Sequence, residues 1–158
     1  MKGGNGFVCL VDRAWSKPFD DPEFWNPKMR APECVNAAAA RSVLPITLDR
    51  ARWAVTGVPK AEIIARTRKA FEGKTMPIPA SGSMVYMMSR QQYLSDAGAP
   101  HWHPHVMFYV PLTKAADWGA NLPGSPVIHA DDEATGITTF FVLAPKWSDG
   151  TSAVMVMK

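Results

Sequence analysis

Long apolar runs are missing from this chain of 158 residues, and the signatures of several protein classes are missing with them. No stretch reaches the roughly 18 consecutive apolar residues of a transmembrane helix, so we expect no membrane span. The first residues do not contain the apolar core of a secretory signal peptide. Phosphate-binding glycine loops and the nucleophile elbow of serine hydrolases are also absent from the sequence. The sequence therefore argues against an integral membrane protein, a P-loop nucleotide-binding protein and a serine hydrolase.

Charge is sparse and nearly balanced. Charged residues make up 20% of the chain, and the net charge at pH 7 is +3. The tightest basic group, Arg66, Arg68 and Lys69, lies on a segment that is typical of a solvated helix surface. We therefore expect no nucleic-acid partner. The apolar content of 47% is typical of a globular protein, and the length predicts a single domain over residues 1–158.

Cysteine is scarce, since the chain has two, Cys9 and Cys34. They flank a proline-rich segment that has little regular structure of its own. A disulfide that closes this loop of about 26 residues would stabilise the fold by about 3.5 kcal/mol on the chain-entropy model, and it would form in an oxidising compartment. Two unrelated buried thiols are the alternative. A catalytic thiol is not favoured, because Cys9 lies in an apolar run with no histidine nearby in the sequence.

The pattern of residue types predicts an α+β fold. Segments rich in β-branched, aromatic and other apolar residues predict strands at 7–12, 83–89, 105–110, 127–128 and 137–143. High helix propensity and an apolar stripe at helical spacing predict helices over 34–43 and 59–73. We expect residues 13–32 to form an aromatic, proline-rich loop that packs on the body of the domain. The segment 46–55 is ambiguous between strand and helix. The segment 153–157 could be a last strand or a frayed tail. We expect a mainly antiparallel sheet of about five strands with two or three helices on one face.

Three of the four histidines lie within five residues, in the run His101-Trp102-His103-Pro104-His105. Imidazole is the commonest side-chain ligand of transition metals, and alternate side chains of an extended segment point the same way. Pro104 places the run on a loop that enters a strand at His105. We predict a metal site formed by His101, His103 and His105, with His129 as a remote ligand. The alternative is a solvated edge, or buried rings whose nitrogens are satisfied by backbone groups.

Acidic residues near these histidines could complete a catalytic site. Asp96, Asp131 and Glu133 are the candidates for a base that acts on zinc-bound water. This predicts a zinc-dependent hydrolase of small molecules. The first alternative is an exported, non-catalytic protein that binds copper or another ligand, since thioether and imidazole side chains together suit copper. The second alternative is a structural or partner-binding module. The expected partner is a small-molecule substrate or a metal ion.

Several short motifs look like motifs of known sequences. They are Asn5-Gly6-Phe7-Val8-Cys9, Phe24-Trp25-Asn26-Pro27 with Cys34, Tyr86-Met87-Met88-Ser89, His103-Pro104-His105-Val106-Met107-Phe108 and the run from Trp118 to Pro126. In these motifs the chain resembles a group of uncharacterised, predicted exported bacterial proteins. The resemblance implies a periplasmic or secreted protein whose signal has been removed, with Cys9 paired to Cys34, and it implies no activity. Because the chain shows no signal, a cytoplasmic location stays open.

Overall fold

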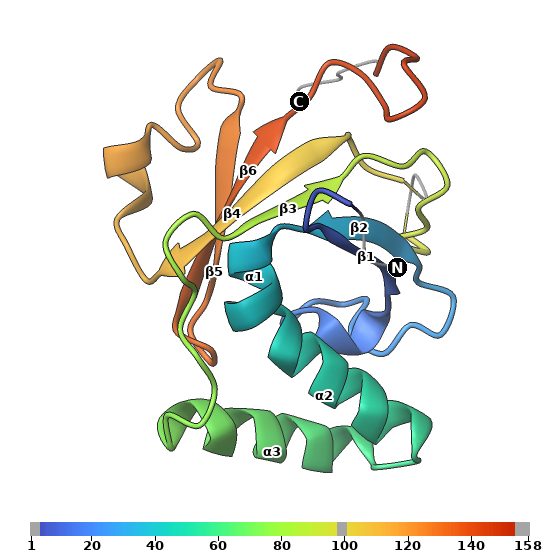
Figure 1. The fold of residues 1–158 in the computed structure, drawn as a ribbon, viewed down its shortest axis with the longest axis vertical. Coiled ribbons are helices and arrows are strands. Elements are labelled where there is room, and N and C mark those ends of the chain that lie inside the picture. Colours follow the sequence, from blue (N-terminus) through green and yellow to red (C-terminus); the bar gives the residue numbers. More distant parts are fainter. Residues whose placement is uncertain (1–3, 98–100, 154–158) are drawn as a thin grey trace.

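The computed structural model describes residues 4–97 and 101–153, which fold around one antiparallel sheet (Figure 1). Within these residues the sheet has six strands in the order β1-β2-β3-β4-β6-β5. The strands are β1 (Val8–Asp12), β2 (Ala31–Val35), β3 (Met84–Met87), β4 (His105–Pro111), β5 (Val127–Asp132) and β6 (Ile137–Leu143). The predicted α+β domain with a mainly antiparallel sheet is confirmed, with slightly more strands than expected.

Three helices follow one another between β2 and β3 in the part of the chain that the structure describes. They are α1 (Ala37–Ser42), α2 (Leu44–Val55) and α3 (Lys60–Glu72). Helices α1 and α2 lie on one face of the sheet, and α3 packs against α2 on the side away from the sheet (Figure 1). Two short 3₁₀ helices, η1 (Ala14–Ser16) and η2 (Ala115–Trp118), complete the fold. The helix predicted over 59–73 is confirmed as α3.

The helix predicted over 34–43 was placed too early. Cys34 and Val35 belong to β2, and the helix begins at Ala37. Asn36 separates the two elements, because its side-chain oxygen accepts a hydrogen bond from the Ala39 backbone N–H at 2.9 Å and caps the helix. The alanines after Asn36 favour a helix, and this led to a predicted start at Cys34. Pairing of β2 with β1 and β3 holds Cys34 and Val35 in a strand instead.

Pro45 begins a helix as well as ending one. Helix α1 ends at Ser42, and Pro45 lies in the first turn of α2. Backbone N–H groups in the first turn of a helix have no intrahelical acceptor, so proline, which lacks this N–H, costs no hydrogen bond there. The segment 46–55, which the sequence left ambiguous, is therefore helical. Strand β5 also continues to Asp132, beyond the short strand expected at 127–128. Most of the segment 153–157 lies outside the described residues.

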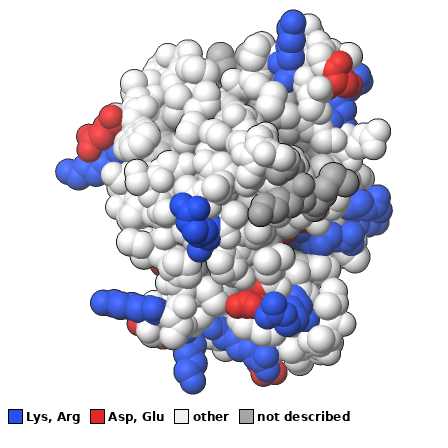
Figure 2. Space-filling view, in the orientation of Figure 1, with Lys and Arg blue, Asp and Glu red and all other residues white. Residues whose placement is uncertain are grey.

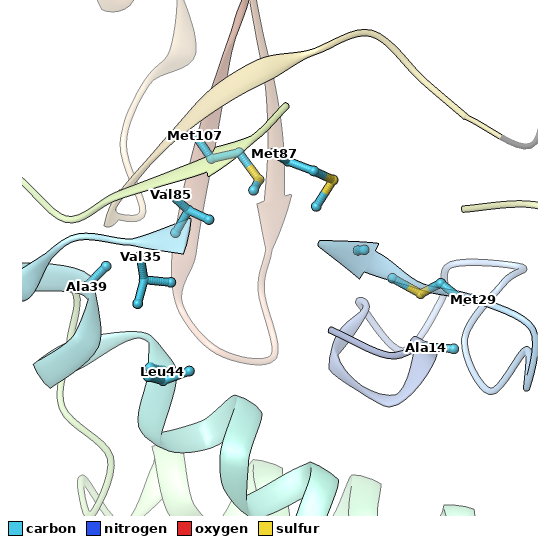
Figure 3. Packing of buried hydrophobic residues seen from close by; sticks show 9 residues of the cluster. Ala14, Met29, Val35, Ala39, Leu44, Val85, Met87 and Met107 are labelled. Atoms are coloured by element: carbon cyan, nitrogen blue, oxygen red, sulfur yellow. The ribbon is translucent and has the colours of Figure 1, made fainter. Parts of the chain in front are cut away.

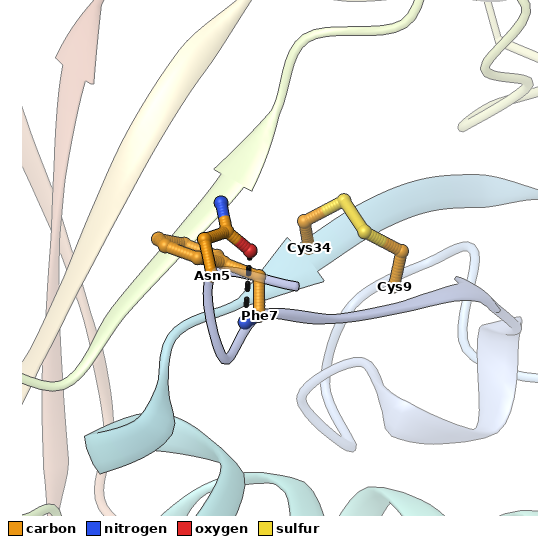
Figure 4. Close-up of a disulfide and its surroundings, with 4 residues drawn as sticks. All are labelled: Asn5, Phe7, Cys9 and Cys34. Carbon is orange, nitrogen blue, oxygen red and sulfur yellow. Dashed lines mark hydrogen bonds between the residues drawn. A yellow bond between two sulfur atoms is a disulfide. The ribbon is translucent and has the colours of Figure 1, made fainter. Parts of the chain in front are cut away.

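Cys9 and Cys34 form a disulfide, as Figure 4 shows. The two residues lie directly opposite each other in the register of β1 and β2, with Cα atoms 4.0 Å apart. The disulfide that the sequence suggested is confirmed, and it joins the edge strand of the sheet to its neighbour. Among the described residues, no helix has the length and apolar character needed to cross a membrane.

The sheet has two faces with different coverings. The inner face, which points to α1 and α2, carries Val35, Val85 and Met107, and these pack in one cluster with Ala39 and Leu44 (Figure 3). The outer face carries Phe140, 1% exposed, which stacks on Trp118 of η2 with ring centroids 4.6 Å apart. Alternation along the strands therefore decides which side chains can reach the helices.

Candidate functional site

A cavity of about 680 Å³ lies between the inner face of the sheet and α2. All six strands contribute to its wall through inner-face residues, and α2 and the segment around η1 supply the opposite wall. This volume is in the range of sites that bind drug-sized molecules, about 300–1,000 Å³. The cavity is therefore the place where a small ligand would fit.

Most of the cavity wall is apolar. Val35, Val85, Met87 and Met107 line it from the three neighbouring strands β2, β3 and β4. Leu44 lines it from α2, and Figure 3 shows these side chains around the space between the strands and the helix. Methionine side chains adapt their shape to neighbouring atoms, so this part of the wall can fit ligands of irregular outline.

Five acidic residues line the cavity, and two of them, Asp12 and Glu33, lie on the neighbouring strands β1 and β2. Leu10 faces Glu33 and Asp12 faces Ala31 in the register of β1 and β2, so the two acids are diagonal neighbours on the inner face. Asp12 Oδ1 accepts a hydrogen bond from the Arg13 backbone N–H at 2.8 Å and one from the Ser16 hydroxyl. Glu33 is 9% exposed, and no described residue donates a hydrogen bond to its carboxyl group.

Burial shifts the ionisation of both acids in the same direction. Burial raises the pKa of Glu33 well above its ordinary value, and the negative charge of Asp12 raises it further. Burial also raises the pKa of Asp12, against the hydrogen bonds from Ser16 and Arg13 and the charge of Arg50, which lower it. The two acids therefore hold their protons more tightly than exposed carboxyl groups do.

Arg50 on α2 is the cation whose charge acts on Asp12, and its donors are directed elsewhere. Its Nη1 donates to the backbone carbonyls of Ser16 at 3.1 Å and Lys17 at 3.2 Å, and its Nε donates to the Thr67 hydroxyl at 3.2 Å. The side chain is 3% exposed, and burial lowers its pKa to about 10. Its Nη2 is buried away from solvent and has no hydrogen-bond partner among the described residues. Arg50 therefore ties α2 to η1 and α3 and offers the cavity no accessible donor.

His105 is a buried member of the cavity wall. It is 2% exposed, its ring lies 4.9 Å from the Trp102 ring and 5.6 Å from the Phe141 ring, and Nδ1 donates to the His103 carbonyl at 2.7 Å. Burial lowers the pKa of His105, so the ring is neutral at pH 7 and Nε2 carries no proton. Tyr109 also lines the cavity, and burial raises its pKa, so it remains a phenol.

The four predicted metal ligands lie in different surroundings, although His101 and His105 both border the cavity. His101 is exposed and packs edge-on against Trp147, with ring centroids 5.8 Å apart, whereas His105 is buried. His129 lies opposite Phe140 on the outer face, so the sheet separates it from His105. Its Nδ1 lies 2.8 Å from the Asn121 amide nitrogen. The described residues contain no group of three or more His, Cys, Asp or Glu side chains that could hold a metal ion, and zinc and copper stay predictions.

The three predicted catalytic acids are also dispersed. Asp96 is exposed and accepts hydrogen bonds from Lys28 at 3.0 Å and from Tyr93, and the Tyr93 hydroxyl is the main cause of the lowered pKa of this carboxyl. Asp131 accepts from the Thr138 hydroxyl at 2.6 Å and, alone of the three, lines the cavity. Glu133 is exposed in the turn between β5 and β6.

The sequence revealed Asp131 but not Asp12 or Glu33 among the acids that line the cavity. Glu33 lay between the loop predicted over 13–32 and the helix predicted over 34–43, so no strand alternation was predicted for it. The signal that could have found it is the run Ala31 to Val35, in which positions 31, 33 and 35 are buried and 32 and 34 are not. A single glutamate on the apolar side of such an alternation indicates a buried acid.

No family model matches the chain, and the curated proteins and solved structures contain no match to it. The geometry of the described residues therefore carries the functional argument, and the resemblance to exported bacterial proteins stays a prediction.

Proposed function

We propose that this protein binds a small, mainly apolar molecule in the cavity between the sheet and α2. The observation that carries the proposal is the cavity itself: about 680 Å³ in volume, walled by valine, methionine, leucine and aromatic side chains and containing a few polar groups. An apolar pocket of this size with a small number of polar groups is the usual form of a ligand site. This corresponds to the exported ligand-binding protein that the sequence offered as an alternative.

The location proposed with this function is periplasmic or extracellular. The Cys9–Cys34 disulfide supports it, because such bonds persist mainly in oxidising compartments. In that setting the protein would sequester or carry its ligand, with the sheet and α2 shielding the apolar body of the ligand from water.

The test is a titration of the purified protein with a neutral apolar fluorescent probe, N-phenyl-1-naphthylamine. Val85 is 1% exposed and lines the cavity from the central strand β3, so Val85→Phe should fill space that the probe needs. Val106 lies on the opposite face of the neighbouring strand β4, and Val106→Phe is the matched control. We expect saturable binding to the wild type, at least tenfold weaker binding to Val85→Phe, and unchanged binding to Val106→Phe. Absence of saturable binding, or equal effects of the two variants, would overturn the proposal.

A further inference from the structure

We propose that the cavity selects amphipathic amines, with the ammonium group between Asp12 and Glu33 and the apolar body on the valine and methionine wall. This inference rests on the proposed function and adds the chemical class of the ligand.

The charge of the cavity wall is opposite to that of the whole protein. Five acidic residues line it, Asp12, Asp21, Glu33, Asp131 and Asp132, against two basic residues, Lys17 and Arg50. The chain as a whole carries a net charge of +3, and Figure 2 shows lysine and arginine side chains dispersed over the face of the molecule in view. The acidic wall is therefore a local feature, and its field attracts a cation.

The two cations of the wall do not neutralise Glu33. Lys17 Nζ lies 2.8 Å from Asp21 Oδ2, so its charge is already paired. Arg50 directs Nη1 to backbone carbonyls and Nε to Thr67, and its Nη2 is buried away from solvent. A carboxylate or phosphate ligand would face Asp12 and Glu33, and the remaining N–H donors of Lys17 belong to an ammonium whose charge Asp21 already balances.

Glu33 requires a donor that the described residues do not supply. Glu33 is 9% exposed, borders the cavity and accepts no hydrogen bond from them, although buried polar groups are normally hydrogen-bonded. Asp12 uses Oδ1 for Arg13 and Ser16, and Oδ2 receives no hydrogen bond from described residues. A primary or secondary ammonium group has two or three N–H donors and can serve both carboxyl groups at once.

Aromatic rings supply a second attraction for a cation. Trp102, Tyr109 and Phe141 all line the same cavity, and the face of an aromatic ring attracts an alkylammonium group. The adjoining valines and methionines suit an aliphatic or aryl-alkyl body. A quaternary ammonium ion would keep the ring contacts but has no N–H to donate to Glu33, so it should bind more weakly than the primary amine.

The test compares four ligands that share one body: 4-phenylbutylamine, its N,N,N-trimethyl derivative, 4-phenylbutanol and 4-phenylbutyrate. Isothermal titration calorimetry at pH 8 measures each dissociation constant for the wild type, Glu33→Gln and the exposed control Glu133→Gln. We expect the amine to bind the wild type at least tenfold more tightly than the alcohol or the trimethyl compound, with the butyrate weakest. Glu33→Gln should bring the dissociation constant of the amine close to that of the alcohol, and it should change the dissociation constant of the alcohol by no more than about twofold. Glutamine keeps the size of the side chain and removes its charge. Glu133→Gln should leave all four dissociation constants at their wild-type values.

The outcomes separate this inference from the proposed function. Equal binding of amine and alcohol, lost together in Val85→Phe, would leave the apolar site standing and overturn the amine inference. Tightest binding of the butyrate would also overturn it. Absence of binding by all four ligands, together with absence of probe binding, would overturn both. If Glu33→Gln does not fold, the ranking of the four ligands on the wild type decides the question by itself.

Discussion

Glu33 and Cys34 are neighbours in β2 whose side chains leave the strand on opposite faces: the Glu33 carboxyl lines the cavity, and the Cys34 sulfur is bonded to Cys9 on the outer face. The same two strands thus carry an acidic pair on one side and a covalent bond on the other. The bond fixes the register of β1 against β2, and this register makes Asp12 and Glu33 diagonal neighbours.

Removing the disulfide should destabilise the protein substantially. The bond closes a loop with a sequence separation of 25 residues. We expect the double variant Cys9→Ser, Cys34→Ser to lose about 3 kcal/mol of unfolding free energy, because the open chain gains conformational freedom when unfolded. Urea denaturation measures the loss. A reducing agent should lower the stability of the wild type to a similar extent and leave the double variant unchanged.

Replacing the unpartnered acid should stabilise the free protein above neutral pH. Glu33 has a raised pKa, so the folded state binds a proton that the unfolded chain, with a carboxyl pKa near 4.5, releases. Its contribution to stability is present below that value and is lost as the pH rises through the raised pKa. We expect Glu33→Gln to reduce this decline and to raise the unfolding free energy by about 1–3 kcal/mol at pH 8. Urea denaturation between pH 4 and pH 8 measures it, and Glu133→Gln should retain the wild-type slope.

His105 should make the folded protein less stable as the pH falls, which is the opposite of the effect of Glu33. Burial lowers its pKa below 6.5, so the unfolded chain takes up a proton before the folded protein does. The contribution of His105 is present above pH 6.5 and is lost as the pH falls through the lowered pKa. His105→Phe cannot be protonated, and it should show a smaller drop in melting temperature between about pH 7.5 and pH 5 than the wild type. The exposed control His101→Gln should show the same fall in melting temperature as the wild type. If His105→Phe also shows that fall, His105 is not the group that causes it.

The outer face should contribute to stability and leave ligand binding unchanged. Phe140 is 1% exposed beneath Trp118, so Phe140→Ala should cost about 3–5 kcal/mol through lost burial and the cavity left behind. Trp118 is 52% exposed, and Trp118→Ala should cost less. Thermal unfolding measures both. Titration of Trp118→Ala with the apolar probe should give the wild-type dissociation constant, since the sheet separates this residue from the cavity.

The sequence predicted the elements whose signal is local. Helix α3 combines an apolar stripe with Pro59 before it and Gly73 after it, and strand β6 is rich in β-branched and aromatic residues, so both were found within one or two residues of their ends. The boundary at Asn36 was missed, because the choice between strand and helix for Cys34 depends on pairing with β1, 25 residues earlier.

The candidate site was harder to predict, because proximity in sequence differs from proximity in space. His101, His103 and His105 are close in sequence, yet one is exposed, one is partly buried and one is buried with its Nδ1 satisfied by a backbone carbonyl. Asp12 and Glu33 are 21 positions apart and carry no motif. Strand register brings them together, and no local pattern encodes it.

The Cys9–Cys34 bond also makes the acidic end of the cavity sensitive to its surroundings. β1 is an edge strand with β2 as its one partner strand among the described residues, so reduction would leave backbone pairing to hold Asp12 beside Glu33. Edge strands open more easily than central ones. A ligand held by both carboxyl groups would accordingly depend on this bond for the alignment of its two contacts.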